Sequence, residues 1–182
     1  MSKVYGLKSS YSLIREDRSR HIASYGMEDV DGVYATWHEV YFYKKMVGKP
    51  TFTQVKKAIL ADIDARTDEK IQNGFVWTPA AGGDPIPVCL SAENKFNFKS
   101  AYDLAVQKNG ATLPVTFKMN QDEDGSNPVY HTFETMEDAD DFYLHAVAYI
   151  HQTYAAGWAE KDGIDWEPYK ALFPEPEVEP ME

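Results

Sequence analysis

The chain has 182 residues, with 18 basic and 29 acidic side chains and a formal net charge of -11. This length suits one domain, or one domain with a small appendage. The negative surface repels phosphate, which argues against nucleic-acid binding through a basic patch, although an acidic protein that mimics DNA stays open. The single cysteine, Cys89, excludes an intrachain disulfide and a thiolate metal cluster.

Two further classes are disfavoured by the distribution of apolar residues. The first twenty residues contain no apolar segment of the kind that signal peptides carry. No apolar run approaches the roughly 20 residues that a membrane helix needs. We therefore expect a soluble protein made in the cytosol that does not use a membrane.

Residues 1–49 are predicted to form a β-rich N-terminal segment. The clearest strand is Tyr34–Tyr43, because it is dense in aromatic and β-branched residues. The turn signal Asp31-Gly32 precedes this strand, and residues 11–15 are expected to be its partner strand. The charged residues 16–20 are expected to form a loop.

The strand Tyr34–Tyr43 carries aromatic side chains on both faces. Trp37, Tyr41 and Tyr43 alternate onto one face, whereas Phe42 lies on the other. Such a strand is covered on both sides, or lies in a subunit interface, or presents rings on which sugars stack. These alternatives make Trp37, Tyr41 and Tyr43 the leading interaction candidates.

Residues 50–166 are predicted to form a separate α+β domain. A helix capped by Thr53 runs to about Asn73, and short strands follow at residues 75–77 and 87–90. A second helix is capped by Ser91. Strands at 113–119 and 129–133 then pair across an acidic turn, and Thr135 caps the last helix.

The order of elements predicts an α+β fold, with small antiparallel sheets packed against about three helices. Residues 167–182 form an acidic tail, and its proline- and glutamate-rich part from Pro174 to Pro180 is expected to be extended or disordered. The connection Thr78–Pro85 contains Gly82-Gly83 and is expected to be a long flexible hairpin. Gly82 and Gly83 are therefore candidates for a local contact.

Several segments in this order resemble a known family. The residues Thr67–Phe75 (TDEKIQNGF), Pro87–Ser91 (PVCLS) and Asn94–Asn97 (NKFN) are similar to the DUF4376 domain. Later segments resemble the remainder of that domain: Leu113–Phe117, Tyr130–Glu134 and Asp141–Tyr143. The Thr78–Pro85 loop departs from the family pattern because it is longer and richer in glycine and proline.

The resemblance implies a context for the protein. DUF4376 domains are found in phage and prophage proteins, often beside tail-fibre genes. The family therefore implies a non-enzymatic bacteriophage structural or assembly protein that contacts tail or fibre proteins, with a homo-oligomer as an open possibility. It further implies a location in the cytoplasm of the bacterial host during assembly, or in the virion. The family brings no cofactor and no established active site.

One motif has the spacing of a cation site. Asn120, Asp122 and Asp124, followed by Gly125, resemble the first half of a calcium-binding loop. The glutamate expected at the last position of such a loop is replaced by His131, and the flanking segments are predicted strands. The pattern favours a solvated hairpin turn over a weak cation site.

For the other reactive residues, a structural role explains the sequence better than a catalytic or metal-binding role. Cys89 can act as a nucleophile only beside a base such as His131, so a small hydrolase is one alternative. His38-Glu39 lacks the second histidine of a zinc-protease helix. His145 and His151 are six residues apart and do not share a helix face.

A carbohydrate-recognition module is the main alternative to the phage structural protein. It requires that aromatic rings around Trp37 are exposed, because sugars stack on accessible ring faces.

Overall fold

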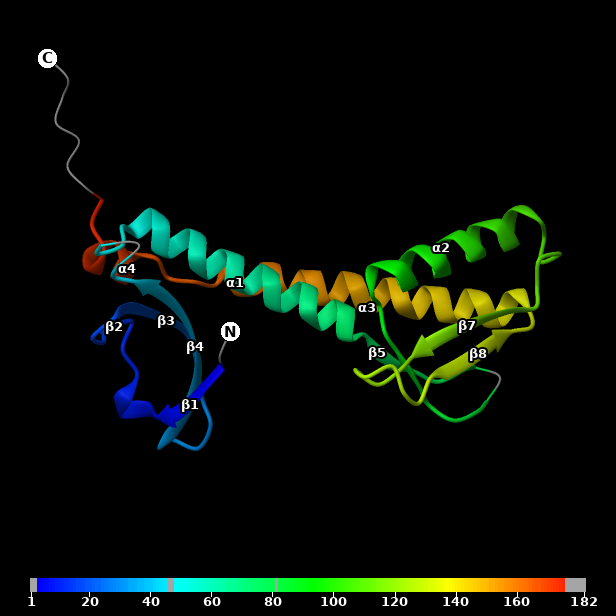
Figure 1. The fold of residues 1–182 in the computed structure, drawn as a ribbon, viewed down its shortest axis with the longest axis horizontal. Coiled ribbons are helices and arrows are strands. Elements are labelled where there is room, and N and C mark those ends of the chain that lie inside the picture. The colour runs from blue at the N-terminus through cyan, green and yellow to red at the C-terminus, as the bar shows by residue number, and fades with distance from the viewer. Residues whose placement is uncertain (1–2, 46–47, 81, 176–182) are drawn as a thin grey trace, which may run out of the picture. The chain divides into compact units, whose positions relative to one another are not determined.

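The structure is a computed structural model that describes residues 3–45, 48–80 and 82–175. The chain folds as two compact units, the first built from residues 1–65 and 157–182 and the second from residues 66–156. Helices combine with antiparallel sheets of four, two and two strands (Figure 1), which confirms the predicted α+β class. Within the described ranges, no helix has both the length and the apolarity of a membrane span.

The first unit contains a four-stranded antiparallel sheet with the order β1-β4-β3-β2. Its elements are β1 (Lys3–Leu7), the short 3-10 turn η1 (Lys8–Ser10), β2 (Ile14–Glu16), β3 (Arg20–Asp29) and β4 (Tyr34–Tyr43). The strand predicted at Tyr34–Tyr43 is confirmed. Its predicted partner is wrong, since β4 pairs with β1 and β3, and β2 pairs with β3.

The connection between β3 and β4 explains this pairing. Asp31 accepts hydrogen bonds from the backbone N–H groups of Val33 and Tyr34 at 3.0 and 2.7 Å. Gly32 has a positive φ of 82°, which glycine adopts without steric cost. The Asp31-Gly32 turn is therefore confirmed, and it joins β4 to the strand directly before it rather than to residues 11–15.

The core of the first unit lies between this sheet and two helices. The helix α1 (Phe52–Asn73) contributes Val55, Ile59 and Ile63, whose spacing of four places them on one face. They pack with Ala23, Tyr25 and Val40 from the sheet and with Tyr169 and Phe173 from the C-terminal part of the chain. The part of this face that carries Ala23, Tyr25 and Val40 is thereby buried against α1.

The cap of α1 differs from the predicted one. Thr51 Oγ1 accepts from the N–H of Gln54 at 3.3 Å, and Gln54 Oε1 accepts from the N–H of Thr51 at 2.9 Å. This reciprocal pair is a capping box, which satisfies two backbone donors at the helix start. The helix begins one residue before Thr53, so Thr53 lies inside the first turn.

The chain end corrects a second prediction. Residues 167–172, assigned to the acidic tail and expected to follow the last regular element, form the helix α4 (Glu167–Leu172), and Phe173 is fully buried after it. Pro168 stands in the first turn of α4, where a missing N–H costs nothing because that donor has no partner inside the helix. Residues 176–182 lie outside the described part.

The second unit combines two hairpins with helices. Its elements are β5 (Phe75–Trp77), β6 (Ile86–Val88), α2 (Ala92–Gln107), β7 (Val115–Asn120), β8 (Val129–Phe133) and α3 (Met136–Asp162). Trp77, Phe98, Phe133 and Phe142 form an aromatic centre for its core. The predicted hairpins and helices of this region are confirmed.

The two units do not follow the predicted segments 1–49, 50–166 and 167–182. Helix α1 begins in the first unit and ends in the second, while α3 begins in the second and ends in the first. The predicted boundary at Gly48-Pro50 does separate β4 from α1 along the chain. The glycine and proline at residues 48–50 therefore mark the boundary between a strand and a helix. The boundary between the two units falls later, within α1.

Gly74 allows β5 to approach β6 directly after α1. Its φ is 75°, and a Cβ at this position would lie 1.7 Å from the backbone oxygen of Val88. No larger residue fits without a shift of the backbone. The expected end of the helix at Asn73-Gly74 is confirmed.

The cap of α2 gives a first testable expectation. Ser91 Oγ accepts from the N–H of Asn94 at 3.2 Å, as predicted for an N-cap. Replacement by alanine removes that acceptor and is expected to lower the free energy of unfolding by about 1 kcal/mol. Urea denaturation of Ser91→Ala measures the change. Ser91→Asp, which keeps an acceptor oxygen, is the control and is expected to stay close to the parent chain.

Candidate interaction surface

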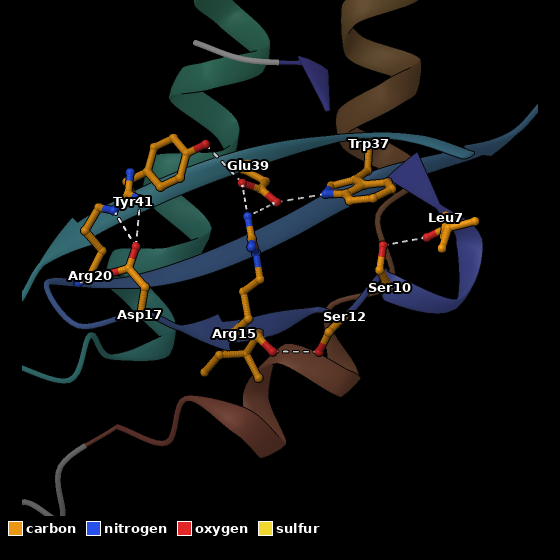
Figure 2. A network of polar contacts seen from close by, with 10 residues as sticks. Leu7, Ser10, Ser12, Arg15, Asp17, Arg20, Trp37, Glu39 and Tyr41 are labelled. Atoms are coloured by element: carbon orange, nitrogen blue, oxygen red, sulfur yellow. Dashed lines mark hydrogen bonds and ion pairs between the residues drawn. The ribbon is translucent and has the colours of Figure 1, made fainter. Parts of the chain in front are cut away.

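Glu39 is a buried carboxylate at the centre of the N-terminal sheet, with only 1% of its surface exposed. Arg15 Nη2 lies 2.8 and 2.9 Å from its two oxygens. The Trp37 indole N–H donates to Glu39 at 2.9 Å, and the Tyr41 hydroxyl donates at 3.0 Å. Figure 2 shows these three donors converging on the one carboxylate from β2 and β4.

The strand period explains how the sequence builds this network. Trp37, Glu39 and Tyr41 alternate onto one face of β4, opposite the face on which Val40 packs towards α1. Arg15 reaches them from β2 because it pairs with Ile22 of β3, which in turn pairs with Tyr41. The carboxylate therefore links an outer strand to β4 across β3.

A second ionic contact extends the network at the start of β3. Asp17 Oδ2 accepts from Arg20 Nε at 2.8 Å, and the Arg20 guanidinium lies 4.8 Å from the centre of the Tyr41 ring. The Asp17 carboxylate also accepts from the backbone N–H groups of Ser19 and Arg20. These contacts hold the β2–β3 turn against the ring that donates to Glu39 (Figure 2).

The Glu39 network makes a pH-dependent contribution to stability. Burial raises the pKa of Glu39, but hydrogen bonds from Trp37, Arg15 and Tyr41 and the charge of Arg15 outweigh it, so that the pKa lies below the ordinary value of a glutamate. A lowered pKa in the folded state means that the unfolded state binds the proton more readily. The contribution is therefore present above the unfolded pKa and is lost as the pH falls through the folded pKa.

Glu39→Gln provides the reference for this effect. The difference in free energy of unfolding between the parent chain and Glu39→Gln is expected to be largest near neutral pH and to shrink as the pH falls below the ordinary pKa of a glutamate, about 4.3. Urea denaturation at a series of pH values measures it. A difference that stays constant from neutral pH down to the acid range would show that the Glu39 charge does not contribute.

The three predicted interaction residues of β4 differ in how far their side chains are exposed to solvent. Trp37 is only 5% exposed, and it packs edge-to-face on Tyr11 with ring centres 5.8 Å apart. A Cβ on Gly6 would lie 2.8 Å from its ring, so Gly6 is the residue that admits it. Trp37 is therefore a structural residue, and the sugar-stacking interpretation loses the ring on which it depended.

The other two rings have different surroundings. Tyr41 is half-buried and gives its hydroxyl to Glu39, whereas Tyr43 is 54% exposed at the end of β4. A single exposed tyrosine on a sheet is ordinary for a protein surface. Tyr43 is available for contact, whereas Trp37 is buried and Tyr41 is half-buried.

A different set of exposed apolar residues lies at the β1 side of the sheet. Tyr5 is 61% exposed, and Leu7 and Tyr34 are exposed beside it. The rings of Tyr5 and Tyr34 stack with centres 5.3 Å apart and planes 7° from parallel. Leu7 pairs directly with Tyr34 across the β1–β4 ladder. We refer to Tyr5, Leu7 and Tyr34 as the tyrosine strip.

The register fixes the face on which the tyrosine strip lies. Tyr5 is opposite Thr36 and Leu7 is opposite Tyr34, and even-numbered residues of β4 share the face of Val40. Val40 is buried against α1, whereas the strip is not covered. Ion pairs flank the strip, from Lys3 to Glu28 at 3.0 Å and from Lys8 to Asp29.

The glycines of the Thr78–Pro85 loop are open to solvent. Gly82 and Gly83 have φ values of 95° and 141°, and no atom lies within 4 Å of a Cβ built on either. These conformations favour glycine and explain the choice of residue. Ala81, beside them, lies outside the described residues. The two glycines shape the loop, and both are exposed.

The structure brings three of the chemical candidates to one hollow of the second unit. Cys89, Asn120 and Asp122 line a cavity of about 410 Å³, together with Ser91 and Lys118. Asp122 accepts from the side chains of Ser126 and Asn127, and Asp124 accepts from the N–H of Ser126.

These carboxylates close the hairpin turn between β7 and β8. Within the described ranges, no three histidine, cysteine, aspartate or glutamate side chains gather as metal ligands would.

Cys89 and His131 have different partners. The Cys89 thiol donates to the backbone oxygen of Gln72 at 3.4 Å. His131 Nε2 lies 2.9 Å from Asp138 Oδ2, and its ring packs edge-on against Trp77 at 5.0 Å. His145 Nδ1 lies 2.8 Å from the backbone oxygen of Asp141. Each side chain has a structural contact of its own.

Comparison with known proteins identifies the family. No curated protein and no solved structure shows significant similarity to the chain. The model of DUF4376, a domain of unknown function, matches residues 54–177, well over half of the chain. The tyrosine strip and the Glu39 network precede the matched range. The match confirms the resemblance that the sequence motifs suggested, and the chain belongs to the DUF4376 family.

Proposed function

We propose that this chain is a non-enzymatic structural or assembly protein of a bacteriophage or prophage, and that it acts through protein–protein contacts at the tail or tail fibre. The tyrosine strip is the observation that carries the proposal. It groups large exposed apolar side chains on a regular sheet. The phage context rests on the resemblance to DUF4376 proteins, which implies tail or fibre proteins as partners.

The composition of the tyrosine strip suits a protein partner. Tyrosine is enriched at protein interfaces because its ring supplies apolar area while its hydroxyl tolerates water. The ion pairs of Lys3 with Glu28 and of Lys8 with Asp29 lie beside the apolar centre, as polar groups do at the rim of an interface.

The Glu39 network supports the same role. It joins β2 to β4 on one face of the sheet, and the tyrosine strip lies on the other face. A preformed surface loses less conformational entropy when it binds than a surface that must first become ordered. The hydrogen bonds and ion pair of Glu39 therefore hold the sheet in place, while the uncharged rings of Tyr5 and Tyr34 remain free to contact a partner.

The engaged reactive side chains also favour a role without catalysis. Cys89 donates to Gln72 and His131 pairs with Asp138, so neither activates the other in this arrangement. A nucleophile needs a base within hydrogen-bond reach. Cys89→Ala is accordingly expected to keep any function that the protein shows in phage assembly.

Mass spectrometry of purified particles and of complexes purified with tail or fibre proteins tests the proposal. The chain is expected in the particles, or in an assembly complex formed in the bacterial cytoplasm. Its absence from both would contradict the proposal. A double variant, Tyr5→Ser with Tyr34→Ser, is expected to reduce its recovery, while Tyr43→Ser, an exposed tyrosine outside the strip, serves as the matched control.

A further inference from the structure

The two outer strands of the N-terminal sheet are protected to different degrees. β2 is an outer strand of three residues that includes Arg15 and Glu16, and short charged edges resist pairing with another chain. β1 is the other outer strand, with five residues and a single charge, on Lys3. Its remaining residues, Val4 to Leu7, are apolar or glycine. β1 is therefore the edge at which a further strand can add.

The ladder between β1 and β4 shows which backbone groups of β1 face outwards. The N–H of Lys8 donates to the oxygen of Val33 at 2.9 Å, in the same register as the β1–β4 pairs. Inward and outward N–H groups alternate along an antiparallel strand, so those of Val4 and Gly6 point towards β4. Those of Lys3, Tyr5 and Leu7 point to the open edge.

We propose that β1 pairs antiparallel with β1 of a second copy of this chain, around a two-fold axis at Tyr5. The outward N–H and C=O groups of Tyr5 then bond to those of the other Tyr5. Lys3 of each copy lies opposite Leu7 of the other, and their outward groups bond in the same way. Val4 comes opposite Gly6, which has no side chain to obstruct it. The inference deepens the proposed function, because it uses the same strip.

The charge of the edge does not oppose a second copy as the occupant, in contrast to most of the surface. A chain of net charge -11 repels its copies over most of its surface. At β1, the charge of Lys3 is balanced by Glu28 at 3.0 Å, and Lys8 is paired with Asp29. Antiparallel pairing sets Lys3 against Leu7, whereas parallel pairing would set Lys3 against Lys3 and is disfavoured.

The rings of the strip favour the same arrangement. Tyr5 stacks on Tyr34 of the neighbouring strand in its own chain. An added strand lies about 4.8 Å from β1, and directly opposed aromatic side chains interact at this spacing. The two Tyr5 rings would therefore join the two stacks into one row of four tyrosines. This row doubles the apolar face that the proposed function requires.

Sedimentation velocity of the full chain tests the dimer. The parent chain is expected to sediment as a dimer, and Tyr5→Pro as a monomer, because proline removes an outward N–H while leaving the bonds to β4. Tyr5→Thr keeps the N–H and loses the ring, so a weakened dimer is expected. Circular dichroism checks that the variants fold. A monomeric parent chain, or a Tyr5→Pro variant that dimerises as strongly as the parent, would overturn the inference.

Cross-linking tests the position of the two-fold axis. In the proposed pair the two Tyr5 Cα atoms are about 5.5 Å apart. Tyr5→Cys is therefore expected to form a covalent dimer with a short bismaleimide, several times faster than Tyr43→Cys. Cys89 is present in both variants and contributes equally. Equal rates for the two variants would contradict the pairing at β1.

The two proposals fail in different ways. A chain that is monomeric in sedimentation and still purifies with tail or fibre proteins sinks the dimer and keeps the proposed function. A dimer that forms through β1 and appears in no particle or assembly complex keeps the inference and sinks the phage role.

Discussion

Replacing Glu39 by alanine is expected to lower the free energy of unfolding by about 2–4 kcal/mol. The variant leaves the indole N–H of Trp37 buried without its acceptor, which lies 2.9 Å away in the parent chain. It also leaves a cavity where the side chain was, since Glu39 is 1% exposed. Arg15 loses its partner at smaller cost because about half of its side chain is already in water. Urea denaturation measures the total.

A surface glutamate of the same sheet provides the control for Glu39. Glu28 pairs with Lys3, but both side chains are largely exposed. Glu28→Ala is therefore expected to change the free energy of unfolding by less than about 1 kcal/mol. Equal losses from Glu39→Ala and Glu28→Ala would contradict a structural role for the buried network.

Replacing Trp77 by alanine is expected to have the largest effect in the second unit, about 3–5 kcal/mol. Trp77 is 1% exposed and packs against His131, Phe133 and Phe142. Its indole N–H donates to Asp141 at 2.9 Å. The variant removes a large apolar volume and leaves Asp141 without this donor, so both packing and hydrogen bonding are lost.

Two variants separate the contributions at Trp77. Trp77→Phe keeps a ring and loses the donor to Asp141, and an intermediate loss is expected. Val76→Ala changes the neighbouring residue of β5, which is exposed, and is expected to stay within about 0.5 kcal/mol of the parent chain. Urea denaturation of the three variants measures these losses. If Val76→Ala were as destabilising as Trp77→Ala, the special role of Trp77 in the core would be contradicted.

The sequence predicted the second unit more fully than the first because its signals are local. Ser91 precedes a helical pattern and caps it, and Gly74 follows the last turn of α1, where its positive φ is required. These residues act on backbone groups within a few positions of themselves. The hairpins and helices between them could therefore be read without knowledge of the tertiary structure.

The first unit was less predictable because its pairing is not local. β1 pairs with β4 from about thirty residues away, and its short pattern KVYGL contains a glycine that weakens the strand signal. Gly6 is there because Trp37 packs against it, which only the folded sheet reveals. α4 was missed for a related reason, since its apolar residues pack on a sheet far earlier in the chain.

The exposed residues of the candidate surface were also hard to predict, because exposure depends on segments that are distant in the sequence. The aromatic pattern of β4 drew attention to Trp37, but the alternation of a strand does not say which face another segment covers. Tyr34 and Tyr5 are the exposed pair, and the only available signal was the period of two that puts Tyr34 on the face opposite to Trp37. The burial of Glu39 was hidden as well, because its counter-charge, Arg15, belongs to a different strand.

The amount of a strip variant that is incorporated into purified particles tests whether the tyrosine strip makes the contact with the partner. Tyr34→Lys places a charge on the apolar face without changing the open edge of β1, and Tyr43→Lys places one on an exposed tyrosine outside the strip. Both variants are first checked for folding and dimer formation. We expect Tyr34→Lys to be depleted from particles or assembly complexes and Tyr43→Lys to be recovered like the parent chain. Equal recovery of Tyr34→Lys and the parent chain would contradict such a contact.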